Sequence, residues 1–156
     1  MKKSILCRLF RLGLVPKRLL SVFDEEGIVV IDEGICGRFV TENVDGPGKR
    51  YRARLERFCG FLVITKLRVV CYSFRKRQIN ISVDDKKIND LYVESPAEQE
   101  LRLSFESSDY REGWRGIIEF QFYTDKALLF REALVENGAQ QGTARDRYCA
   151  ALHSDR

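Results

Sequence analysis

The sequence predicts a mainly β domain: a small antiparallel barrel or sandwich capped by one C-terminal α-helix, with a short helical N-terminal arm. Many short segments alternate apolar and polar residues and are separated by turn residues, which is typical of antiparallel strands. Helical spacing is confined to the two ends of the chain. We expect an arm over residues 1–26, the domain over 27–138 and a flexible tail over 139–156.

The N-terminal segment predicts a basic amphipathic arm. Residues 4–12 place apolar side chains on one helical face and Arg8 and Arg11 on the other, and Pro16 ends this segment. Residues 19–23 indicate a second short turn of helix. The two arginines interrupt the continuous apolar stretch that a signal peptide requires, so we expect the arm to be retained.

Three roles stay open for this arm: packing its apolar face on the domain, lying on an anionic membrane surface, or contacting a partner protein. The membrane alternative depends on its basic charge, because each basic group near an anionic membrane contributes about 1 kcal/mol. The candidate membrane-contacting residues are Lys2, Lys3, Arg8, Phe10 and Arg11.

From Gly27 the pattern is that of β-strands. Expected strands cover residues 28–31, 35–40, 51–55, 61–64, 67–72, 79–83, 88–93, 101–105 and 118–122. The strongest turn signal is Asp45-Gly46-Pro47-Gly48. Period-two alternation then places Arg50, Arg52 and Arg54 on one face of a strand and three apolar residues on the other.

Near the C-terminus the spacing changes to that of a helix. Ala127, Phe130 and Leu134 form one apolar stripe, with Thr124 or Asp125 as the expected cap and Asn137-Gly138 as the expected end. Beyond that point apolar periodicity is lost, which predicts a loose tail that contains the single histidine, His153.

Composition and motifs argue against several classes of function. A net charge of +4 falls short of a dedicated nucleic-acid binder, so we expect no specific nucleic-acid partner. The five cysteines are scattered without zinc-site spacing, which predicts reduced thiols, a cytoplasmic protein, and neither metal nor cofactor. The single histidine lies in the expected tail and no catalytic motif is present, so we expect no enzyme activity.

Two basic clusters and one aromatic residue are the candidate binding residues. The first cluster is Lys49, Arg50, Arg52, Arg54 and Arg57, whose arginines suit bidentate contacts to phosphate. Its alternative interpretation is a solvated strand that is kept charged to prevent edge pairing. The second cluster is Arg75, Lys76 and Arg77 at a hairpin tip. Trp114 is either a plug or lid of the barrel or an anchor at an interface.

Several segments, taken in order, resemble the pleckstrin-homology-like superfamily, in its GRAM and bacterial PH-like branch. Residues 60–65 followed by 67–70 look like the opening hairpin of that branch. Residues 79–83 with 88–93 are similar to its next strand pair, and 118–122 then run into the closing helix. The resemblance covers about residues 27–137 and implies a small β-barrel with one C-terminal helix.

The resemblance implies a binding or scaffolding role rather than catalysis. We expect a protein partner or a second copy of the chain. The alternative is a peripheral membrane module that binds anionic headgroups through the arm and the first basic cluster. A barrel that encloses a small apolar ligand is a third class, disfavoured because small barrels are filled by their own side chains.

Overall fold

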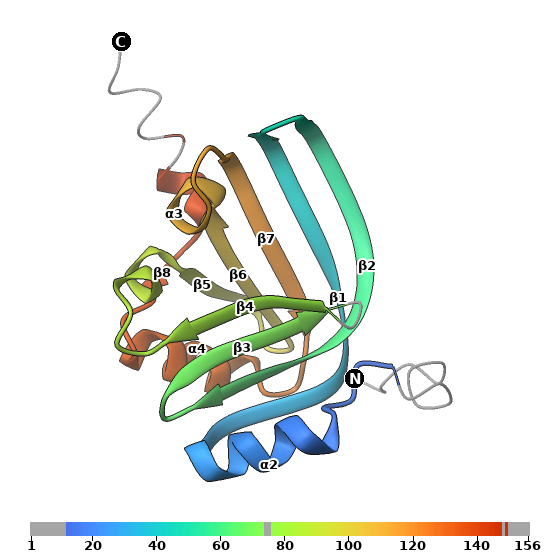
Figure 1. Cartoon of the computed structure of the whole chain (residues 1–156), viewed down its shortest axis with the longest axis vertical. Helices are drawn as coiled ribbons and strands as arrows, with labels where there is room; N and C mark the ends of the chain where they lie inside the picture. Colours follow the sequence, from blue (N-terminus) through green and yellow to red (C-terminus); the bar gives the residue numbers. More distant parts are fainter. Residues whose placement is uncertain (1–11, 74–75, 148, 150–156) are drawn as a thin grey trace.

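The computed structural model describes residues 12–73, 76–147 and 149, and within them one curled, half-barrel sheet dominates (Figure 1). The sheet holds eight strands in the order β4-β3-β2-β1-β7-β6-β5-β8. The mainly β fold with a C-terminal helix is therefore confirmed. Residues 4–11 of the first predicted helix (4–12) lie outside the described residues, and so do Lys2, Lys3, Arg8, Phe10 and Arg11, the candidate membrane-contacting residues.

The elements alternate in the order that the sequence patterns indicated. The strands are β1 (Ile28–Gly46), β2 (Lys49–Thr65), β3 (Arg68–Ser73), β4 (Lys76–Ser82), β5 (Tyr92–Ala97), β6 (Glu100–Glu106), β7 (Arg115–Tyr123) and β8 (Gln140–Gln141). The labelled helices are α2 (Lys17–Glu26), the 3-10 helix η1 (Lys86–Asp90), α3 (Ser107–Tyr110) and α4 (Ala127–Glu136), and residues 144–147 are also helical.

A long hairpin of β1 and β2 forms the back of the sheet. The two separate strands predicted at 28–31 and 35–40 are one strand, because Gly34, with φ 63°, makes a bulge that bends β1 without ending it. The predicted turn at Gly46–Gly48 joins the two strands. The hairpin reaches well beyond β3, whose pairing with β2 begins at Gly60.

The strand predicted over residues 88–93 is wrong in its first half. Asp85 accepts a hydrogen bond from the Lys87 N–H at 3.0 Å, and this favours the 3-10 turn η1. The strand β5 begins only at Tyr92. The predicted cap of α4, Thr124 or Asp125, is wrong: the N-cap position is Lys126, which has no side-chain cap hydrogen bond. Thr124 Oγ1 instead accepts from the Lys126 N–H at 3.1 Å, in the turn before the helix.

The main core lies on the concave side of the sheet, where α4 covers one end. Ala127, Phe130 and Leu134, the predicted stripe, are fully buried there against residues such as Leu62 and Leu103. In Figure 1, α4 lies beside β5 and β6, while β3 and β4 cross in front of β6 and β7. Among the described residues, only the four-residue helix α3 lies at the other end of the concave side.

The helix α2 packs on the opposite, convex side of the sheet. Phe23 is 1% exposed and forms a second apolar cluster with Val15, Phe61, Val63 and Val70. Alternation along β2 produces this division, because its even-numbered residues from Phe58 to Ile64 face the main core and its odd-numbered ones face α2. For residues 15–26, the arm therefore docks on the domain.

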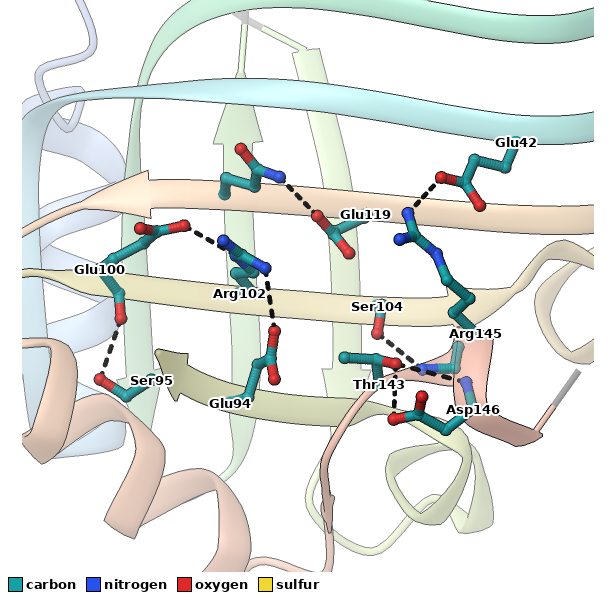
Figure 2. A network of polar contacts seen from close by, with 12 residues as sticks. Glu42, Glu94, Ser95, Glu100, Arg102, Ser104, Glu119, Thr143, Arg145 and Asp146 are labelled. Atoms are coloured by element: carbon teal, nitrogen blue, oxygen red, sulfur yellow. Dashed lines mark hydrogen bonds and ion pairs between the residues drawn. The ribbon is translucent and has the colours of Figure 1, made fainter. Parts of the chain in front are cut away.

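The tail predicted as loose from residue 139 is packed over its first part. The strand β8 pairs in parallel with Tyr92 and Val93 of β5. The Ala144 N–H then donates to Ser104 Oγ at 2.9 Å, and the neighbouring Arg145 forms an ion pair with Glu42 (Figure 2). The prediction failed because the buried residues of this segment include the small side chains of Ala139 and Ala144, which do not form a periodic apolar pattern in the sequence.

Among the described residues, no helix is long and apolar enough to cross a membrane.

Candidate functional site

A groove opens on the concave side of the half-barrel, at the end that α4 does not cover. Its volume is about 460 Å³. One wall is β4, and the other consists of side chains from β1, β6, α3 and β7. We call it the β4 groove, and its residues are Phe39, Arg77, Gln78, Ile79, Asn80, Ile81, Asp85, Lys87, Phe105, Ser107, Tyr110, Arg111, Trp114, Ile118 and Phe120.

The β4 groove runs along the edge of β4. Five consecutive residues, 77–81, line it. Successive side chains of a strand point to opposite faces of the sheet. A hollow that contacts five consecutive residues must therefore lie along the edge of the strand as well as against one face. The strand β4 is also the first in the sheet order, with β3 on its other side. Backbone groups of β4 that do not face β3 are therefore directed toward the groove.

The wall opposite β4 is aromatic. The ring of Phe105 packs against Tyr110 with centroids 4.4 Å apart, and Phe39 packs against Phe120 at 5.0 Å. The Tyr110 hydroxyl donates to the Lys87 carbonyl at 2.8 Å, which ties α3 to η1. Burial raises the pKa of Tyr110 above its ordinary value of 10, and the carboxylates of Asp90, Asp109 and Asp85 act in the same direction.

The groove also contains a polar group without a partner. Ser107 is 3% exposed, and its Oγ makes no hydrogen bond. A buried hydroxyl without a partner is costly, by about 1–3 kcal/mol, and is therefore a natural place for a ligand hydrogen bond.

A second hollow of about 600 Å³ adjoins the β4 groove. It lies between β2 and the start of β4 and is lined by Phe39, Glu56, Arg57, Ser73, Lys76 and Gln78. The two hollows share Phe39 and Gln78, so they form one continuous surface. Around that surface stand the cationic side chains Arg57, Lys76, Arg77, Lys87 and Arg111 and the carboxylates Glu56 and Asp85. Its net charge is positive.

The structure brings the two predicted basic clusters together at one point. Arg57 of the first cluster and Lys76 of the second line the same hollow. Arg77 lines the β4 groove beside it. Arg75 lies outside the described residues. The rest of the first cluster, Lys49 to Arg54, lies farther along the β1–β2 hairpin.

The hairpin arginines are exposed but partly compensated by acids. Arg54 forms an ion pair with Glu56. Arg50 stands opposite Asp45 in the register of β1 and β2, and Asp45 also accepts a hydrogen bond from Arg115 at 2.8 Å. This hydrogen bond, with the charges of Arg115 and Arg50, lowers the pKa of Asp45.

Charge on this part of β2 also has a structural explanation. Before Gly60, β2 pairs with β1 on one side, and among the described residues no strand pairs with its other side. Exposed strand edges are commonly kept charged to prevent association. Lys49, Arg52 and their neighbours lie on this edge. Their position fits the alternative interpretation of the first basic cluster, in which its charges prevent the edge from pairing with another strand. The apolar face predicted for this strand is not buried, since Leu55 is 60% exposed.

Trp114 lies at the far end of the β4 groove. Its ring is half-buried, and the Arg111 guanidinium lies 4.6 Å from the ring centroid. A Cβ at Gly46 would come 2.5 Å from Trp114 Cδ2, so the ring rests on the tip of the β1–β2 hairpin. It lines the groove as well as a smaller hollow at the hairpin tip.

Most residues of the groove were not identifiable from the sequence. Phe39, Phe105 and Phe120 read as ordinary core positions, since alternation alone does not distinguish a covered core from its uncovered end. Within the described residues, no group of three or more metal-ligating side chains is present. The sequence matches no protein-family model and no curated protein.

Proposed function

We propose that this chain is a non-catalytic PH-like binding module that takes an extended segment of a protein partner along the β4 groove. The proposal rests on one observation: the open edge of β4 runs along a groove whose opposite wall is aromatic. The antiparallel order from β1 to β7, followed by α4 against the core, supports the PH-like assignment.

Pairing with β4 gives affinity through the backbone. An added strand forms main-chain hydrogen bonds with the edge, and its alternate side chains enter the hollow. The middle of the edge, Gln78–Ile81, carries no charge that would prevent such pairing. On the opposite wall, Phe105, Tyr110 and Ile118 offer apolar surface to the inserted side chains.

The charges specify the chemistry of the partner segment. Arg77, Lys87 and Arg111 line the groove against a single carboxylate, Asp85. Arginine and lysine favour carboxylates in the partner. The occupant is therefore an extended segment in which apolar or aromatic residues alternate with aspartate or glutamate. The unpartnered Ser107 hydroxyl adds one polar contact inside the groove.

The proposal is tested with a displayed library of random extended peptides. Selection should enrich alternating apolar and acidic sequences, and the selected peptides should change the emission of Trp114, the single tryptophan of the chain. The double variant Arg77→Glu/Lys87→Glu should bind them at least about tenfold more weakly. The matched control is Arg50→Glu/Arg52→Glu, which changes equal charge outside the groove and should leave binding unchanged.

Two results would overturn the proposal. One is a selection that enriches no acidic sequence at low salt. The other is a set of peptides whose affinity falls in the Arg50/Arg52 variant and persists in the Arg77/Lys87 variant, since that would place the binding surface on the hairpin.

Binding of anionic membrane headgroups is the second candidate, and exposed Leu55 favours it. An exposed apolar side chain on a strand that also carries the exposed Arg52, Arg54 and Arg57 can enter a bilayer interface while the cations meet phosphates. Co-sedimentation with phosphatidylserine vesicles, at low and high salt, tests this candidate. Pelleting that is lost in Leu55→Ser and in Arg50→Glu/Arg52→Glu supports it, and a protein that stays in the supernatant at low salt excludes it.

A further inference from the structure

Cys36 and Cys59 face each other across the β1–β2 hairpin. They are directly paired in the register, and their Sγ atoms lie 3.5 Å apart. Both side chains are half-buried rather than sealed in the core. This contrasts with Cys71, which is fully buried, where burial raises the pKa of the thiol and suppresses its reactivity.

We propose that Cys36 and Cys59 form a two-thiol site that closes into an intramolecular disulfide when it meets a peroxide. A disulfide bond is about 2.05 Å long, so the two sulfurs need to approach by roughly 1.5 Å. Opposed residues on antiparallel strands have Cβ atoms about 4.5–5.5 Å apart, and disulfides accept up to about 4.5 Å. Closure therefore needs only a small inward movement of the hairpin strands.

The reaction consumes one peroxide and yields two waters. One thiolate attacks a peroxide oxygen, so an S–O bond forms, the O–O bond breaks, and the departing hydroxide takes a proton to become water. The second thiol then attacks the sulfenic sulfur, the S–S bond forms and the S–O bond breaks, releasing the second water. The sulfurs are oxidised and the peroxide is reduced. The site stands independently of the function of the β4 groove.

The position of the crosslink has a physical consequence for the hairpin. Two positions along the register from the cysteine pair, Arg38 stands directly opposite Arg57. Like charges directly opposite each other weaken strand pairing. One position farther, Phe39 pairs with Glu56, and both line the hollow between β2 and β4. A disulfide at Cys36–Cys59 holds the hairpin closed next to this like-charged pair and fixes the strands that carry this wall.

The test treats the full-length chain with hydrogen peroxide at low protein concentration, followed by alkylation and peptide mapping. We expect the number of thiols that can be alkylated to fall by two, with Cys36 linked to Cys59. Amide hydrogen exchange over residues 36–42 and 53–59 should slow on oxidation and recover on reduction.

Variants separate this site from the other thiols. Cys149→Ser is the matched control, because Cys149 is exposed and its loss should leave the crosslink intact. Cys36→Ser and Cys59→Ser should each abolish the crosslink and leave the remaining cysteine as a sulfenic acid that a sulfenic-acid probe traps. A disulfide that maps to Cys7 or Cys149 instead, or thiols that all persist while the fold is intact, would overturn the proposal.

Discussion

The Trp114 ring rests directly on Gly46, so that the loop before β7 and the tip of the β1–β2 hairpin hold each other in place. Any Cβ at Gly46 would meet the ring, with Cδ2 at 2.5 Å. The contact joins segments almost seventy positions apart in the chain, and an ion pair between Arg115 and Asp45 stands next to it. Because Trp114 is the single tryptophan, its fluorescence reports on this junction without interference from another indole.

Gly46→Ala should displace the Trp114 ring. The added methyl group has no room beside the indole, so the ring moves toward water and its emission shifts to longer wavelength. Gly48→Ala is the control: it strains the same turn through a φ of +70°, but no atom lies within 4 Å of the added carbon. A shift of similar size in both variants would contradict the contact.

Phe23→Ala should undock α2. Phe23 is the largest side chain that α2 buries, and loss of a buried phenylalanine costs about 3–5 kcal/mol. Urea unfolding should show this loss, and limited proteolysis should cleave between residues 12 and 26. Val22→Ala, on the exposed side of the same helix, should change the free energy of unfolding by less than about 0.5 kcal/mol.

Glu26 links the end of α2 to the β2–β3 turn. Its carboxylate accepts from the buried Thr65 hydroxyl at 2.9 Å and pairs with Arg68 at 2.6 Å. Glu26→Gln removes the charge of a partly buried pair and should cost about 1–3 kcal/mol in urea unfolding. The exposed neighbour Glu25, changed to Gln, supplies the comparison, and equal effects of the two changes would show that the pair contributes nothing.

Asp109 should make the fold less stable as pH rises. Burial raises the pKa of Asp109, and the carboxylates of Asp90 and Glu106 raise it further while Arg147 opposes them. A folded-state pKa above the ordinary value of 3.8 means that stability is lost as pH rises through that raised pKa.

Asp109→Asn removes this cost. The variant should unfold at higher urea concentration than the parent at neutral pH, and the difference should vanish near about pH 3, where the carboxyl is protonated in both states. Asp84→Asn, on the exposed turn before η1, provides the control. A difference that is constant with pH would assign the effect of the substitution to packing rather than to charge.

Alternation predicted those strands best that have one covered face. The alternation of Leu101 and Leu103, for example, matches their complete burial in β6. It failed where side-chain capping overrides propensity, as at Asp85, and where small residues carry the packing, as at Ala144. The β4 groove was not predictable, because it depends on which part of the concave face α4 leaves uncovered.

The pairing of β8 with β5 determines how far copies of this chain can add to one another. A sheet whose two edge strands can both accept a further strand can associate without limit, as in fibres. A sheet with one such edge strand can only form a dimer. Here β8 occupies part of the β5 end, and Pro96, which lacks an N–H, weakens the rest of it. If β4 meets β4 of a second copy, the described sheet order of the pair ends on both sides in the two-residue strand β8, which offers little to extend.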